Sequence, residues 1–157
     1  MKLKTKFLLM LVVVASAVSS CSKDDYDAEK QAAKDDALIV EFITKNNIPA
    51  IKHSSGLYYQ IITPGTGASV TSSSTVGVVY TGKLLDGTQF DQATSTISFP
   101  LGSGLIAAWN IGLPLIKVGG RIRLISPSTL AYGNKSPGPG IPKNAILDFT
   151  IDLHNVQ

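Results

Sequence analysis

The chain has 157 residues, 44% of them hydrophobic and 16% charged, which is enough for one domain with its own core. Its formal charge is +3, but three of the 14 basic residues and none of the 11 acidic residues lie in the first 20 positions. The remainder is neutral overall and has no basic run of the kind that binds nucleic acid.

Residues 1–20 have the order of a secretory signal: three lysines, an apolar run over 7–14, and small residues. The apolar run is too short to span a bilayer core of about 30 Å as a helix. Cys21, the only cysteine, follows, and Val18-Ser19-Ser20-Cys21 resembles a bacterial lipobox with Val where Leu is favoured. The sequence predicts an exported protein, anchored in the bacterial envelope through a lipidated Cys21. An ordinary signal with a stray cysteine nearby is the alternative.

Residues 21–27 are polar and predict a short tether, and the segment 28–47 predicts a helix. Apolar side chains recur through this segment between Lys and Asp residues, Asp27 is suited to cap its first turn, and Asn46-Asn47 ends the pattern. An amphipathic helix of this length buries its apolar side against a partner. The sequence leaves open whether that partner is its own domain, a second copy or a membrane surface.

After Pro49 the periodicity changes from helical to alternating, which predicts strands. Four strands are expected, over 56–62, 76–80, 120–125 and 147–154. Asp86-Gly87 predicts a hairpin turn, because glycine there supplies the positive φ that such turns need. One or two helical turns are expected within 105–113. The sequence therefore predicts an α+β domain with a mostly antiparallel sheet and one short helix.

Several kinds of catalytic or binding site are excluded by spacing. His53 and His154 lie far apart and lack the ligand spacing of a metal site. The chain contains no G-x-S-x-G nucleophile motif, and its glycine pairs lack the strand-then-helix context of a phosphate loop. The sequence therefore predicts no metal, no cofactor and no covalent nucleophile.

Seven short motifs follow one another through the second half of the chain. They are Val79-Tyr80-Thr81-Gly82, Leu85 to Asp91, Phe99-Pro100-Leu101-Gly102, Ile106 with Trp109, Val118-Gly119-Gly120, Ala131-Tyr132-Gly133, and Gly140-Ile141-Pro142 with Phe149. In this combination, over residues 56–155, the chain resembles the FKBP family of peptidyl-prolyl cis/trans isomerases. The resemblance implies a sheet curved around a short helix and an isomerase domain over 48–157. It also implies proline-containing polypeptides as substrates and no cofactor.

The resemblance implies which residues line a proline pocket. They are Tyr80, Phe90, Asp91, Ile97, Leu105, Ile106, Trp109, Tyr132, Ile141 and Phe149. Trp109 would form the floor under the proline ring. The backbone N–H of Ile106 and the hydroxyl of Tyr132 would hold substrate carbonyls, and Asp91 would orient polar groups. The loop 133–142, dense in Pro and Gly, would overhang the site.

The chain departs from the family pattern in three places. Ile97 would replace an aromatic wall residue, the segment 92–96 has no Arg to pair with Asp91, and Ser126 to Thr129 lacks an acidic residue often found there. These departures leave a second hypothesis, a lipoprotein that binds peptides or a partner in the same pocket without turnover. Taken without the resemblance, Trp109 and Phe149 are ordinary core residues. Arg121 and Arg123 are expected on a solvated face of the sheet.

Overall fold

The computed structural model describes residues 26–102 and 104–157, so the expected signal, Cys21 and most of the tether lie outside the described residues. Within the described part, no helix is both long enough and apolar enough to cross a membrane. The elements in chain order are α1 (Ala28–Lys45), β1 (Ile51–Lys52), β2 (Tyr58–Thr63), β3 (Thr75–Leu84), β4 (Gln89–Pro100), α2 (Ala107–Gly112), η1 (Leu113–Leu115), β5 (Arg121–Ser126), η2 (Ser128–Leu130) and β6 (Leu147–Val156).

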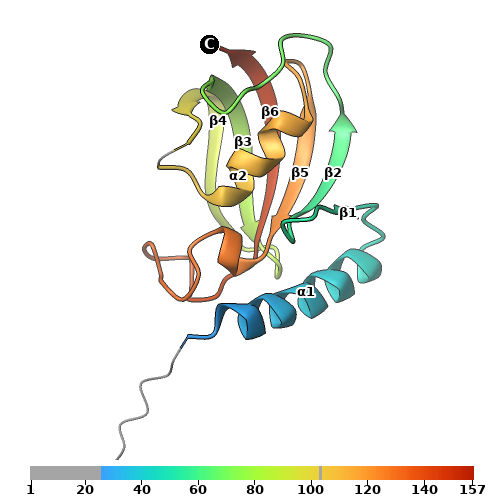
Figure 1. Ribbon diagram of the computed structural model, residues 1–157, viewed down its shortest axis with the longest axis vertical. Coiled ribbons are helices and arrows are strands. Elements are labelled where there is room, and N and C mark those ends of the chain that lie inside the picture. Colours follow the sequence, from blue (N-terminus) through green and yellow to red (C-terminus); the bar gives the residue numbers. More distant parts are fainter. Residues whose placement is uncertain (1–25, 103) are drawn as a thin grey trace, which may run out of the picture.

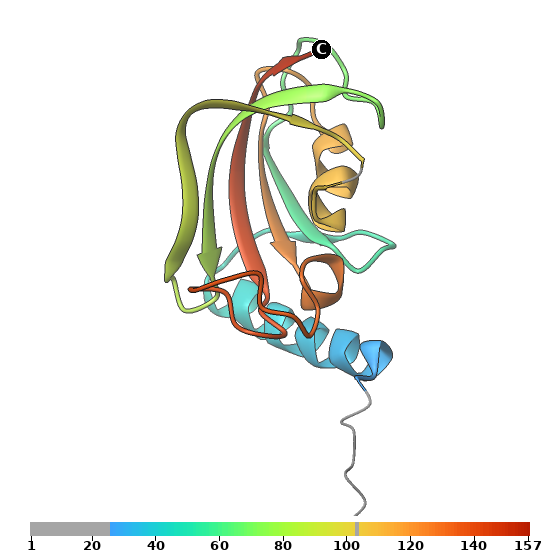
Figure 2. The same cartoon turned by 90° about the vertical axis from the view of Figure 1, so that its left-hand side faces the viewer.

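Six strands form one sheet in the order β1-β2-β5-β6-β3-β4, and every neighbouring pair is antiparallel. Figure 1 shows α2 lying across one face of this sheet, and in the side view of Figure 2 the strands bend around that helix. The predicted α+β class, with a curved antiparallel sheet around one short helix and a helical N-terminal extension, is confirmed.

The concave face of the sheet and α2 enclose the main hydrophobic core. From Leu147 to Leu153, every second side chain of β6 is buried there, as the alternation predicted: Leu147, Phe149, Ile151 and Leu153. The helix can approach the sheet closely because Gly112 has no side chain, and a Cβ at this position would lie 2.5 Å from the Leu124 side chain. The close approach places the side chains of α2 directly against those of the strands.

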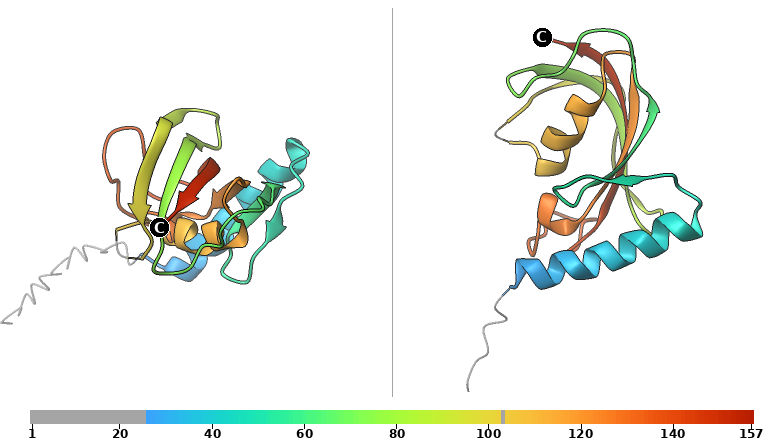
Figure 3. Two further views of the ribbon diagram at one scale, coloured as in Figure 1. Left: turned by 90° about the horizontal axis from the view of Figure 1, so that it is seen from above. Right: turned by 45° about the vertical axis from the view of Figure 1, so that its right-hand side comes forward.

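Helix α1 packs on a second, smaller core, which is made by side chains of β2 and β5 and of the segment just before β6. Ile39 of the helix is fully buried against Tyr58, Ile125 and Ile146. The helix begins where it was expected, since the Asp27 carboxylate accepts hydrogen bonds from two backbone N–H groups of the first turn. The partner that the sequence left open is therefore the protein's own domain, whose lower end α1 crosses in Figure 3.

The expectation of a solvated face for Arg123 is wrong. Its guanidinium donates two hydrogen bonds, of 2.8 and 2.6 Å, to the buried carboxylate of Asp148 and lies over the ring of Phe42 in α1. The helix covers this face of the sheet, and the alternation of one strand cannot reveal such a cover. The side chain of Arg121, in contrast, is half exposed, and its Nη1 lies 3.5 Å from Oδ1 of Asp152.

Strands β1 and β4 were not predicted from the sequence. β4 is an edge strand, rich in Thr, Ser and Gln, and its partly polar sequence does not alternate. The hairpin that joins it to β3 is confirmed: Gly87 has a φ of 89°, and the N–H of Leu84 donates to the carbonyl of Thr88. This hairpin makes β4 the outer wall of the site.

Candidate active site

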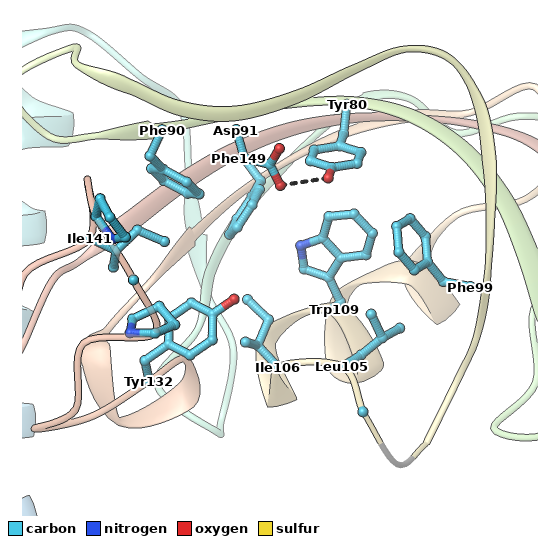
Figure 4. A pocket seen from close by; sticks show the side chains of 14 residues that line it. Tyr80, Phe90, Asp91, Phe99, Leu105, Ile106, Trp109, Tyr132, Ile141 and Phe149 are labelled. Carbon is cyan, nitrogen blue, oxygen red and sulfur yellow. Dashed lines mark hydrogen bonds between the residues drawn. The ribbon is translucent and has the colours of Figure 1, made fainter.

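A cavity of about 370 Å³ opens between α2, the strands β3, β4 and β6, and the loop that follows η2. Figure 4 shows its side chains converging from these elements. The lining residues are Tyr80, Phe90, Asp91, Phe99, Gly104, Leu105, Ile106, Trp109, Tyr132, Pro137, Gly138, Pro139, Ile141 and Phe149. Nine of the ten residues expected to line a proline pocket are among them. The size is within the range of small-ligand sites.

The floor of the cavity is the indole of Trp109, which is only 4% exposed. Its ring centroid lies 5.0 Å from that of Tyr80 and 5.5 Å from those of Phe99 and Phe149, all in edge-to-face contact. Phe90 extends the wall by packing edge-on against Phe149 at 5.6 Å. Aromatic rings arranged edge to face hold one another in fixed orientation, so the cavity has a rigid, apolar base.

Backbone geometry places the floor and the wall. Ile106 is extended, with φ −62° and ψ 147°, and α2 starts directly after it, so Trp109 lies in the first turn of that helix. On β3, Gly82 lies behind the aromatic wall, where a Cβ would be 2.7 Å from the Phe90 ring and 2.9 Å from the Phe149 ring. The absence of a side chain at Gly82 is therefore what lets both rings take their positions.

Polar groups lie at the rim of the cavity. The hydroxyl of Tyr80 donates to one carboxylate oxygen of Asp91 at 2.6 Å, and the backbone N–H of Gln92 donates to the other at 2.8 Å. Burial, together with the hydrogen bond to Asp91, raises the pKa of Tyr80 well above its usual value. Burial and the nearby charge of Asp91 also raise the pKa of Tyr132. Both phenols are therefore protonated at neutral pH.

Two donors that face the cavity have no acceptor among the described residues. The hydroxyl of Tyr132 points inward from the loop in Figure 4, and the backbone N–H of Ile106 lies at the start of α2. The indole Nε1 of Trp109 also lacks a partner in the described part of the chain, but it is buried and therefore not open to a ligand. Donors without partners beside an apolar cavity suit a ligand that carries carbonyl groups.

The loop after Tyr132 lines the cavity in part, as expected for 133–142. Pro137, Gly138 and Pro139 belong to the lining, and Gly138 pairs with Ile141 in an isolated bridge. The Ser136 hydroxyl lies within hydrogen-bond distance of the carbonyls of both bridge residues, at 3.0 and 2.7 Å. These contacts fix a tight turn at the mouth of the cavity.

The expectation that Ile97 lines the pocket is wrong. Ile97 is 43% exposed on the edge strand β4, next to a point where the pairing of β3 with β4 shifts in register. Phe99, two residues further on, takes the wall position and contacts Tyr80 and Trp109. The cavity wall formed by β4 is therefore aromatic at this point. The sequence already held the signal for this, because Phe99 opens one of the motifs that carried the resemblance.

The chain was compared with known protein families and with individual relatives. The family model of FKBP-type peptidyl-prolyl cis-trans isomerases matches residues 67–154. FkpA of Escherichia coli K12, named an FKBP-type peptidyl-prolyl cis-trans isomerase, is 38% identical over 142 residues, which cover 88% of this chain and 51% of FkpA. The outer membrane protein MIP of Legionella longbeachae is 40% identical over 133 residues, covering 83% of this chain and 56% of MIP. The chain thus spans about half the length of these two relatives.

Solved structures agree with the sequence comparisons. The crystal structure of Escherichia coli FkpA matches with a TM-score of 0.70 and 39% identity, over 83% of this chain and 62% of that one. A peptidyl-prolyl cis-trans isomerase from Pseudomonas syringae pv. tomato DC3000 matches with a TM-score of 0.72 and 30% identity, over 85% of this chain and 98% of that one. On its sequence, its fold and its aromatic cavity, this chain belongs to the FKBP-type peptidyl-prolyl cis-trans isomerase family.

Proposed function

We propose that this protein catalyses the cis/trans isomerisation of Xaa-Pro peptide bonds and so assists the folding of exported polypeptides. The observation that carries the proposal is the cavity itself, which is floored by Trp109 and bordered by the donors of Ile106 and Tyr132. A pyrrolidine ring is apolar and compact, and the amide that precedes it carries the carbonyl groups that such donors bind. Uncatalysed isomerisation takes tens of seconds, which is slow enough to limit folding.

The proposed mechanism is preferential binding of the twisted amide. Rotation about the peptide bond breaks its conjugation and costs about 18–20 kcal/mol. The twisted amide is less polar across its C–N bond than the planar one, so transfer into an apolar aromatic cavity favours the twisted state. Binding that is stronger in the transition state than in the ground state accelerates the reaction without covalent chemistry. A reduction of the barrier by roughly 5–8 kcal/mol gives on the order of 10⁴- to 10⁶-fold acceleration.

In this mechanism the rim residues have separate roles. The N–H of Ile106 and the hydroxyl of Tyr132 donate to substrate carbonyls, because neither has an acceptor among the described residues. The Tyr80 hydroxyl is already engaged with Asp91, so Tyr80 orients Asp91 while its ring contacts the substrate. Tyr132 donates as a neutral phenol at physiological pH, in keeping with its raised pKa.

A protease-coupled assay on a Xaa-Pro peptide tests the proposal. Turnover by the parent protein that Tyr132→Phe lowers to a smaller but measurable rate supports the isomerase. Peptide binding at the cavity with turnover at the uncatalysed rate would establish the binding module instead. A change of stability alone on altering Trp109, with neither binding nor turnover in the parent protein, would leave only a structural role.

The proposal also covers the location of the protein: it is exported and then anchored to a membrane by a lipid on Cys21. The basic, apolar and small-residue order of 1–20 and the cysteine that follows support it. So does the similarity to a relative named an outer membrane protein. In cells labelled with a fatty-acid analogue, the protein should carry the label and sediment with membranes. Cys21→Ala should abolish both.

The division of the chain into a signal over 1–20, a tether over 21–27, a helix over 28–47 and an isomerase domain over 48–157 also remains a prediction. The family match over 67–154 lies inside the last of these segments. Limited proteolysis of the exported protein, with mass spectrometry of the fragments, tests the boundaries.

A further inference from the structure

Helix α1 does more than cover the sheet, because it also contacts the turn that carries Tyr132. Figures 1 and 3 place the N-terminal half of α1 beside η2, the short helix that leads to Tyr132. The link is Asp35, which is fully buried. One of its carboxylate oxygens accepts from the backbone N–H of Ser128 at 2.7 Å and from the Ser128 hydroxyl at 2.6 Å. The other accepts from the side-chain amide of Gln31 at 2.7 Å.

Ser128 in turn fixes the backbone on both sides of Tyr132. Its carbonyl accepts from the N–H of Ala131 at 2.9 Å and from the N–H of Gly133 at 2.8 Å. Ser128 therefore connects Asp35, 93 positions earlier in the chain, to the two residues that flank Tyr132. Its backbone N–H and hydroxyl bind the helix, and its carbonyl closes the turn.

A second contact reaches the same turn. Tyr26, just before α1, lies so close to Gly133 that a Cβ added at Gly133 would be 3.5 Å from the Tyr26 hydroxyl. The segment 26–45 therefore contacts the chain on both sides of Tyr132: Asp35 binds Ser128 before it, and Tyr26 lies beside Gly133 after it.

The packing of α1 on the domain does not by itself require a buried acidic residue at position 35. Ile39 and the partly buried Phe42 and Ile43 already provide an apolar contact with the sheet, and Asp36 accepts a hydrogen bond from the Tyr58 hydroxyl. A buried carboxylate carries a desolvation cost, and an apolar residue in its place often stabilises a protein as well or better. What the hydrogen bonds of Asp35 add is a fixed geometry: two of them hold Ser128, and the third, from Gln31, holds the carboxylate itself.

We propose that Asp35 is a positioning residue for the isomerase site, which holds the Tyr132 hydroxyl in the cavity by fixing Ser128. The proposal rests on the proposed function in so far as it concerns turnover. The geometric part, that Asp35 fixes the turn, can be measured without any turnover. The sequence 126–129 lacks an acidic residue, and the carboxylate of Asp35 in α1 takes up the N–H and hydroxyl of Ser128.

The experiment compares Asp35→Ala with Asp36→Ala in the otherwise unchanged protein. Asp36 is the matched control, because it lies on the same helix and binds Tyr58 and Lys52 rather than Ser128. Hydrogen exchange at the amides of Ala131 and Gly133 is expected to become roughly tenfold faster in Asp35→Ala and to change by less than about twofold in Asp36→Ala. Asp35→Asn keeps an acceptor oxygen for Ser128 and should restore part of the protection.

Turnover gives the second readout. Asp35→Ala is expected to lower kcat/KM roughly fivefold, and to lower it by less than about twofold when Tyr132 is already Phe, since the hydroxyl to be positioned is then gone. If Asp35→Ala does not fold, Ser128→Ala and Asp35→Asn carry the same comparison. Unchanged exchange at 131 and 133, an equal effect of Asp36→Ala, or an equal loss of turnover in the Tyr132→Phe background would each overturn the proposal. If the parent protein shows no turnover, the proposed function is contradicted, but the positioning role is not. The exchange measurement still decides whether Asp35 fixes the turn.

Discussion

The hydroxyl of Tyr80 donates a 2.6 Å hydrogen bond to Asp91 at the rim of the aromatic cavity. The other carboxylate oxygen of Asp91 is taken by the N–H of Gln92, so the side chain is held at both oxygens without an arginine partner. One residue of the cavity wall therefore orients the acidic group of the rim. The sequence showed both residues but not their contact, because they lie on separate strands.

Tyr80→Phe tests this contact, because it removes the donor while keeping the ring. Asp91 loses its fixed orientation, so kcat/KM is expected to fall several-fold, with a stability loss of about 1 kcal/mol. Peptide turnover and chemical denaturation measure the two effects. Combined with Asp91→Ala, the change is expected to cost little further activity, since both variants break the same pair. Fully additive losses would show that the two residues act separately.

The tyrosine pKa values predict how stability depends on pH. Tyr80, Tyr132 and Tyr58 all have raised pKa values in the folded protein, chiefly through burial. Their contribution is complete below the unfolded value of about 10 and is lost as the pH rises from there toward the folded values, because the unfolded state then ionises first. Denaturation midpoints measured between about pH 8 and 11 should fall at the upper end. Tyr80→Phe should make that fall shallower, and an unchanged slope would contradict the assignment.

Variants of Phe99 and Ile97 test which of these two residues forms the wall of the cavity. Both lie on β4, but only Phe99 contacts Trp109, whereas Ile97 faces solvent. Phe99→Leu is expected to lower kcat/KM roughly tenfold, because it opens the aromatic wall around the transition state, and Ile97→Ala is expected to change it by less than about twofold. Turnover of one Xaa-Pro peptide by both variants decides the matter. A larger effect at Ile97 than at Phe99 would restore the original expectation.

Elements with strong periodicity could be predicted from the sequence. β6 alternates from Leu147 to Leu153, and both its limits and its buried side were found to within a few residues. β4 could not be predicted in the same way, because an edge strand with one uncovered side does not need apolar residues at every second position. The misplacement of Ile97 followed from the same cause, since the register shift beside it is set by pairing with β3.

The residues of the candidate site that belong to a sequence motif could be predicted. Those whose role depends on a contact between distant parts of the chain could not. Trp109, Phe149 and Tyr132 were found by their motifs, and all three line the cavity. Asp35 gave no such signal, because an acidic residue on an amphipathic helix looks solvated until the fold brings Ser128 to it. The same holds for Arg123, whose cover is a helix from another part of the chain.

Trp109 makes ligand binding directly observable, because it is the only tryptophan and forms the cavity floor. A proline ring seated on the indole changes the surroundings of the part of the ring that faces the cavity, so the intrinsic fluorescence should shift in a saturable manner as a Xaa-Pro peptide is added. A peptide with Ala in place of Pro serves as the control and should leave the spectrum unchanged at the same concentrations. Equal responses to both peptides would exclude a proline-selective cavity.

Gly82 gives the most local test of the cavity, because its neighbours form the aromatic wall. A methyl group at Gly82 would overlap the rings of Phe90 and Phe149, so Gly82→Ala must push at least one of them toward the cavity. Overpacking of this kind lowers the stability of a protein by about 1–3 kcal/mol. Because the cavity becomes narrower, the variant is also expected to lose most of the kcat/KM of the parent protein. Gly77→Ala is the matched control on the same strand, because the added methyl meets the exposed side chain of Asn155, away from the cavity. Both changes therefore add a methyl to β3, and only the one at Gly82 should abolish peptide binding measured by Trp109 fluorescence. Normal binding in a folded Gly82→Ala variant would show that the substrate does not enter between these rings.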